Sequence, residues 1–66
     1  MQITLNGEAR EFAAEQSLAA LVADLDLAGK RFAVELNTEV VPRSTFAEVC
    51  LRDGDRVEIV HAIGGG

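Results

Sequence analysis

Apolar and polar residues alternate in the first part of the chain, and this alternation predicts β-strands. Ile3 and Leu5 fall on one side with polar residues between them, as in a strand with one buried face. Asn6-Gly7 follows, and this pair favours a type I′ hairpin turn because both central positions need a positive φ. A second strand is expected over residues 9–13, with its phenylalanine facing inward. The chain should therefore open with an antiparallel hairpin.

After Ser17 the apolar period lengthens to three or four residues, which predicts one amphipathic helix. The apolar positions that share one helical face are Leu18, Leu21, Val22 and Leu25. Ser17 fits the N-cap because its hydroxyl can accept a free amide hydrogen of the first turn. Gly29 fits the left-handed residue that closes a helix, so we expect the helix to end there.

The second half of the chain alternates again and predicts three further strands. They are expected over residues 32–37, 40–41 and 56–61, and the last has Val57 and Ile59 facing inward. Pro42 cannot donate to a strand ladder and favours the end of the short strand. Turns are expected at residues 37–39 and 53–55.

A short helical segment is expected between the fourth and fifth strands. Thr45 and Glu48 have the spacing of a capping box, which marks a helix start. The segment 44–49 is too short to be stable alone, so we interpret it as a single turn, with Phe46 tucked beneath it.

The order of these elements predicts the fold class. An α+β domain is expected, with a mixed five-strand sheet, one main helix and a short helical turn. The first and last strands should lie parallel in the middle of the sheet, and the main helix should belong to the crossover between them. This is the ubiquitin-like β-grasp arrangement.

Length and composition limit what such a chain can do. Its 66 residues allow one domain at most, with little room for both a core and an internal active-site cleft. Acidic residues outnumber basic ones by 11 to 6, for a formal charge of −5, and the basic residues form no stripe that would bind nucleic acid. The acidic charge suits either docking to a basic patch on a protein or solubility alone.

No segment predicts secretion, a membrane span or a disulfide framework. Polar residues interrupt the N-terminal apolar residues, and no apolar stretch approaches the roughly 20 residues of a spanning helix. The one cysteine, Cys50, excludes disulfide pairs within the chain and four-cysteine metal sites. We therefore expect a cytoplasmic protein without a bound cofactor.

The side chains offer little catalytic chemistry. His61 has no second histidine for a metal site, and we interpret it as a half-exposed residue at a strand end. Cys50 lies between Val49 and Leu51, and we interpret it as a small buried apolar residue. The acidic residues occupy turns or exposed positions without a pocket. We accordingly expect neither a catalytic side chain nor a metal site.

The glycine run at residues 64–66 is the strongest functional signal. Glycine adds nothing to a core, so we expect a β-grasp domain over residues 1–62 and a flexible tail over residues 63–66. Extended, the last five residues reach about 17 Å, far enough to enter another protein's cleft. The α-carboxylate is unreactive until an ATP-using partner converts it to an acyl-adenylate, which a sulfur or amine nucleophile can attack. A frayed terminus without function is the alternative.

Apolar residues near the tail predict a docking surface for the partner. Val60 should face outward from the last strand, and Ile63 directly precedes the glycines. Together they would form a small apolar surface where the tail begins.

The whole chain resembles the ThiS family, the sulfur carrier proteins of thiamine biosynthesis. The resemblance rests on Asn6-Gly7-Glu8, on Val41-Pro42-Arg43, and on the run from Asp53 to Val60 that leads into Ile63-Gly64-Gly65-Gly66. It implies that Gly66 is the modified residue, that Gly64 and Gly65 are needed in the partner's cleft, and that Val60 and Ile63 match the docking region.

The resemblance also implies a set of partners. An E1-like adenylating enzyme of the ThiF type would use ATP to activate Gly66. A cysteine desulfurase relay would supply the sulfur that gives a thiocarboxylate, and a thiazole synthase of the ThiG type would receive it. A transient covalent link between Gly66 and a cysteine of the activating enzyme is implied as well.

Three alternatives remain open at this stage. The small subunit of molybdopterin synthase is also a β-grasp sulfur carrier that ends in two glycines. A ubiquitin-like modifier would join Gly66 to lysines of other proteins. A non-covalent binding module would use the open face of the sheet and leave the tail without a role.

Overall fold

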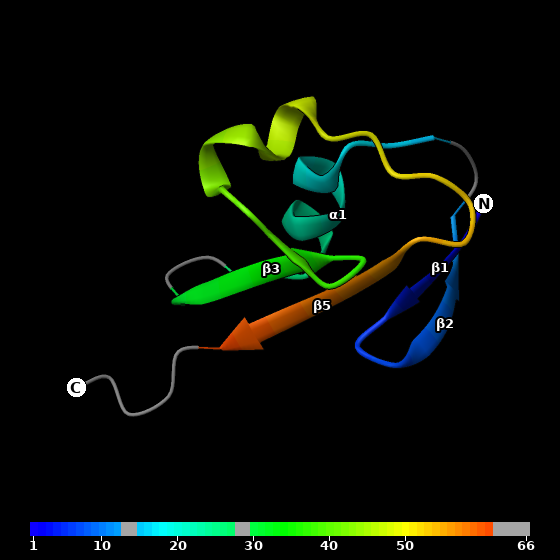
Figure 1. The fold of residues 1–66 in the computed structure, drawn as a ribbon, viewed down its shortest axis with the longest axis horizontal. Coiled ribbons are helices and arrows are strands. Elements are labelled where there is room, and N and C mark those ends of the chain that lie inside the picture. The colour runs from blue at the N-terminus through cyan, green and yellow to red at the C-terminus, as the bar shows by residue number, and fades with distance from the viewer. Residues whose placement is uncertain (13–14, 28–29, 62–66) are drawn as a thin grey trace.

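The five predicted strands and both predicted helical segments are present in the computed structural model, which describes residues 1–12, 15–27 and 30–61. The elements are β1 (Gln2–Leu5), β2 (Glu8–Glu11), α1 (Leu18–Asp24), β3 (Phe32–Leu36), β4 (Glu39–Val41), the 3₁₀ helix η1 (Arg43–Glu48) and β5 (Arg56–His61). They form one sheet in the order β2-β1-β5-β3-β4, and α1 and η1 lie over the same side of it (Figure 1).

The last strand occupies the centre of the sheet. β5 runs parallel to β1, with Thr4 opposite Arg56 and Leu5 opposite Val57. On its other side it runs antiparallel to β3 over five residue pairs, and the two outer pairings are antiparallel as well. The sheet is therefore mixed, with the first and last strands parallel in the middle, and the predicted β-grasp arrangement is confirmed.

The Asn6-Gly7 turn has the predicted backbone conformation. Its two residues have φ values of 51° and 83°, as a type I′ turn requires. The second strand is shorter than predicted, because β2 ends at Glu11. Phe12 follows the strand, and its half-buried side chain packs against the core. The predicted end of this strand, Ala13, lies outside the described residues.

The main helix begins as predicted and ends earlier than predicted. The Ser17 hydroxyl accepts a hydrogen bond from the Ala20 amide at 3.1 Å, which confirms the N-cap. The helix ends at Asp24, where the Leu25 amide donates to the Val22 carbonyl, and Asp26 adopts a left-handed φ of 53°. Aspartate tolerates this region better than most residues, so no glycine is needed to end the helix. The predicted cap, Gly29, lies outside the described residues.

The predicted short helical segment is present as a 3₁₀ helix of six residues, with Phe46 buried beneath it as expected, but the predicted capping box is wrong. The residue at the N-cap is Pro42, with a φ of −61°. Thr45 lies inside η1, and its amide and hydroxyl both donate to the Pro42 carbonyl, at 2.9 and 2.8 Å. Its hydroxyl is thus used as a donor within the turn and caps no amide.

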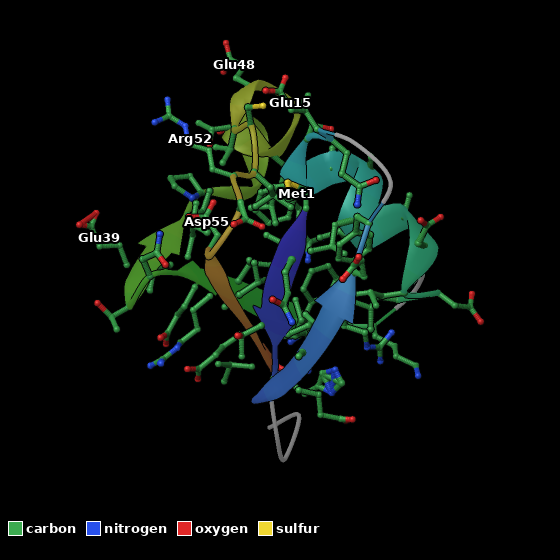
Figure 2. All side chains as sticks on the ribbon, turned by 90° about the vertical axis from the view of Figure 1, so that its right-hand side faces the viewer. Met1, Glu15, Glu39, Glu48, Arg52 and Asp55 are labelled. Carbon is green, nitrogen blue, oxygen red and sulfur yellow. The ribbon has the colours of Figure 1, made fainter. Side chains whose placement is uncertain are left out.

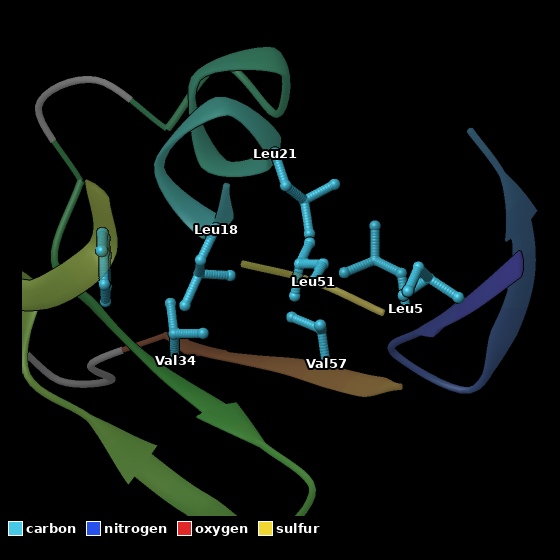
Figure 3. Close-up of a cluster of buried hydrophobic side chains, with 8 residues drawn as sticks. Leu5, Leu18, Leu21, Val34, Leu51 and Val57 are labelled. Carbon is cyan, nitrogen blue, oxygen red and sulfur yellow. The ribbon is translucent and has the colours of Figure 1, made fainter. Parts of the chain in front are cut away.

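A compact apolar core fills the space between the sheet and the helices (Figure 3). Its buried members are Ile3, Leu5, Leu18, Leu21, Val34, Phe46, Leu51 and Val57, and none of the described polar or charged residues is buried as a whole. Leu51 comes from the loop between η1 and β5 and is fully buried. The core therefore holds the loop before β5 as firmly as it holds the strands, which fixes the strand that leads to the tail.

Candidate functional site: the last strand and its outer face

The predicted reactive end of the chain continues from the central strand. Gly64, Gly65, Gly66 and Ile63 lie outside the described residues, so their roles stay predictions. β5 ends at His61. The tail is therefore carried by the middle strand of the five, which has pairing partners on both sides.

Two asparagine side chains add further bonds to this strand. The Asn6 Oδ1 atom accepts a hydrogen bond from the Ile59 amide at 2.7 Å, and the Asn37 Oδ1 atom accepts one from the Arg56 amide at 2.9 Å. Both asparagines have a left-handed φ of 51°. Sequence reasoning predicted the turns at these positions but missed the bonds, because the paired residues are 53 and 19 positions apart.

The Asp53-Gly54-Asp55 turn is a hydrogen-bonded support for the start of β5. The Asp53 carboxylate accepts the Gln2 amide hydrogen at 2.7 Å. The Asp55 carboxylate accepts from the Arg52 amide at 2.8 Å and from the Asn37 side chain at 3.1 Å. Figure 2 shows Asp55 on the chain segment that leads into the strand, whereas Glu39 and Glu48 project away from the molecule. In the described part of the chain, no group of acidic, histidine or cysteine residues could hold a metal ion.

The face of the sheet opposite the helices carries the predicted docking residue. Val60 is 47% exposed and pairs with Ala33, while Glu58 pairs with Glu35 on the same face. Val40 pairs with Glu35 from the other side and is 67% exposed. We call this surface, made by Ala33, Glu35, Val40, Glu58 and Val60, the outer sheet face. The prediction that Val60 faces outward is confirmed, and Val40 is an exposed apolar residue that the sequence did not single out for docking.

Two other candidate residues lie away from this face or at its end. His61 is exposed at the end of β5 and pairs with Phe32 in the sheet. Cys50 is exposed, so its interpretation as a buried residue is wrong. It forms an isolated antiparallel bridge with Ser17, and the extended backbone there turns Leu51 into the core and Cys50 outward. No helix in the described ranges is long and apolar enough to cross a membrane.

Comparisons with known proteins agree with this architecture. The sequence model of the ThiS family matches residues 3–66. The sulfur carrier protein ThiS of Escherichia coli is 35% identical over 66 residues, which is 100% of both chains. The crystal structure of the thiamine biosynthesis protein ThiS of Geobacter metallireducens superposes with a TM-score of 0.86 at 35% identity, also over 100% of both chains.

Longer relatives match as well. A thiazole synthase of Paramagnetospirillum magneticum is 46% identical over 66 residues, and one of Magnetococcus marinus is 44% identical over the same length. The chain spans all of its own residues in both alignments but only 20% of each synthase. The match of the family model to nearly the whole chain, together with a full-length relative and a full-length structural neighbour, shows that the chain belongs to the ThiS family.

Proposed function

We propose that the chain is a sulfur carrier protein that donates sulfur for thiazole formation in thiamine biosynthesis. The observation that carries the proposal is its 35% identity with the sulfur carrier ThiS of Escherichia coli over the full length of both chains. The position of β5 supports it, because a strand bonded on both sides and by two asparagines is a firm base for a reactive tail. In this proposal residues 1–62 form the folded domain that the partner binds, and residues 63–66 form the tail that reaches the partner's active site.

The chemistry takes place at the α-carboxylate of Gly66. A carboxylate oxygen attacks the α-phosphorus of ATP, pyrophosphate leaves, and an acyl-adenylate forms. Hydrosulfide then attacks the acyl carbon, AMP leaves, and a proton is released to give the thiocarboxylate. Gly64 and Gly65 allow the tail to enter a narrow channel of the partner enzyme, because a glycine backbone needs the least room. The protein supplies no catalytic side chain and is the substrate of its partners.

The partners follow from this chemistry. An E1-like adenylating enzyme of the ThiF type binds ATP and activates Gly66, with a transient link to its cysteine, and a cysteine desulfurase relay supplies the sulfur. A thiazole synthase of the ThiG type takes the sulfur from the thiocarboxylate. The two thiazole synthases that match this chain over all its residues support this last partner. We place the reaction in the cytoplasm, where ATP is available, and no cofactor stays bound to the carrier.

The outer sheet face and the residue before the glycines dock the partner. Val60 and Ile63 form the apolar part of this contact. Glu35 and Glu58 lie directly opposite each other on neighbouring strands, an arrangement that is unfavourable in isolation. A positively charged side chain of the partner would relieve their repulsion, which fits a protein with a formal charge of −5.

The proposal is tested by intact-mass spectrometry of the purified protein. The chain is incubated with Mg-ATP, a ThiF-type enzyme and sodium sulfide, which replaces the desulfurase relay. We expect a product heavier by the exchange of one oxygen atom for sulfur, and none when ATP is omitted or Gly66 is deleted. Absence of this product, with an enzyme that thiocarboxylates its own carrier in parallel, would refute the proposal.

A genetic experiment distinguishes the proposed pathway from the alternatives. Loss of the gene should produce a requirement for thiamine that the thiazole moiety relieves. A molybdopterin synthase subunit would instead leave molybdenum enzymes inactive, and a protein modifier would form higher-mass conjugates that disappear when Gly66 is deleted. A non-covalent module would keep its function without Gly65 and Gly66.

A further inference from the structure

A hollow lies on the helix side of the sheet, away from the outer sheet face. It has a volume of about 370 Å³ and is bounded by the end of α1, the start of β3 and η1. Its apolar lining includes Val22, Phe32 and Phe46, which also pack in or against the core. A volume near the lower end of the ligand-pocket range admits one or two side chains.

The charged residues around the hollow carry a net positive charge, whereas the net charge of the whole chain is negative. Lys30 and Arg43 line it with a single acid, Asp26, whereas the chain has 11 acidic and 6 basic residues. All three are exposed, so they surround the mouth of the hollow and leave the apolar residues as its floor. An occupant with an apolar group and a neighbouring negative charge would match both features.

Arg43 is already held in position for such an occupant. Its guanidinium carbon lies 4.6 Å from the centre of the Phe32 ring, and its Nη2 atom donates to the Phe32 carbonyl at 3.4 Å. A stacked guanidinium loses less freedom when it binds a carboxylate than a freely moving one does, and its fork of donors suits carboxylate geometry.

We propose that this hollow binds a short acidic–apolar segment of a partner protein, with an apolar side chain on the floor and a carboxylate on Arg43 and Lys30. The exposed mouth favours a protein segment over a small molecule, because small-molecule sites usually enclose most of the ligand surface. The inference does not depend on the sulfur chemistry. Because the hollow and Val60 lie on opposite sides of the sheet, a partner in the hollow leaves the outer sheet face free.

The proposal is tested by titrating the ¹⁵N-labelled protein with a capped tetrapeptide of two leucines followed by two glutamates. We expect saturable amide shifts at Ala23, Lys30 and Arg43 and none at Glu58 or Val60. Replacing the glutamates with glutamines, or the leucines with alanines, should abolish saturation. Shifts confined to other residues, or equal shifts with the glutamine peptide, would overturn the proposal.

Matched variants test the residues of the hollow. Arg43→Gln should weaken binding about fivefold, near the upper end for an exposed ion pair. Arg10→Gln removes the same charge from β2, at the far edge of the sheet, and should leave the affinity unchanged.

A second pair of variants tests whether the hollow itself must be open. Ala23→Glu should block the hollow, whereas Ala20→Glu, at an exposed position on the same helix, should not. Equal effects within either pair would contradict the proposal, and acetate binding as tightly as the peptide would replace it with a small-anion site.

Discussion

Asn6 joins the first turn to the last strand. Its backbone has a left-handed φ of 51°, and its side chain accepts the Ile59 amide hydrogen at 2.7 Å. The turn conformation and the long-range bond thus occur at the same residue. The strand that leads to the tail is thereby bonded to a turn at the other end of the sequence.

We expect Asn6→Ala to lower the free energy of unfolding by about 1–3 kcal/mol, from the lost hydrogen bond and the strain of a left-handed alanine. Asn6→Gly serves as the matched variant, because glycine accepts the positive φ and loses only the bond. It should cost about 1 kcal/mol. Urea denaturation of the wild-type, alanine and glycine proteins separates the cost of the lost hydrogen bond from the cost of backbone strain. Equal stability of the wild-type and alanine proteins would show that neither contributes.

Asn6 also shows what the sequence can and cannot predict. Its turn was predictable because Asn-Gly carries its own conformational preference, whereas its bond to Ile59 depends on which strands become neighbours. Cys50 was misinterpreted for a similar reason, since its apolar flanks suggested burial and the bridge to Ser17 decided the outcome. The role of Gly66 was proposed from composition and resemblance, and it stays a prediction.

At the scale of elements, α1 is a short helix whose stability depends on the cap at its start and on the burial of its apolar face. It has seven residues, fewer than an isolated helix needs for stability in water. Two residues, Leu18 and Leu21, bury its apolar face, and the Ser17 side chain satisfies one amide at its start. The strong apolar period made this helix predictable, whereas its end was not, because Asp26 could replace a glycine in the left-handed conformation.

Ser17→Ala should therefore lower the free energy of unfolding by about 1 kcal/mol, the usual cost of losing an N-cap side chain. Ser17→Asp retains an acceptor and should keep most of the stability. Thermal unfolding followed by circular dichroism makes the comparison. An alanine variant as stable as the aspartate variant would show that the hydrogen bond from the Ala20 amide to the cap side chain does not stabilise the protein.

The loop before β5 should be as important for stability as the strands. Leu51 is fully buried although it belongs to no helix or strand, so Leu51→Ala is expected to cost about 2–5 kcal/mol. Val40→Ala is the matched control, because Val40 is 67% exposed on an edge strand, and it should change stability by less than about 0.5 kcal/mol. Similar losses in the two variants, measured in urea, would contradict the assignment of Leu51 to the core.

At the scale of the molecule, stability and the proposed sulfur chemistry use different parts of the chain. In the described ranges the buried core residues run from Ile3 to Val57, and none of the polar or charged residues is buried as a whole. The outer sheet face and the hollow lie on opposite sides of the sheet, and the proposed chemistry lies beyond β5. The fold therefore holds the last strand in place. The outer sheet face lies outside the core, whereas the floor of the hollow shares Phe46 with it.

This separation predicts that deletion of residues 64–66 leaves the fold intact and removes the function. The free energy of unfolding should change by less than about 0.5 kcal/mol, because the deleted glycines carry no side chains and the last buried residue in the described part of the chain is Val57. Thiocarboxylate formation should be lost completely. Urea denaturation and intact-mass spectrometry of the same protein preparation measure the two properties. A stability loss above about 1 kcal/mol would show that the glycines pack on the domain. The division into a folded domain of residues 1–62 and a tail of residues 63–66 would then be wrong.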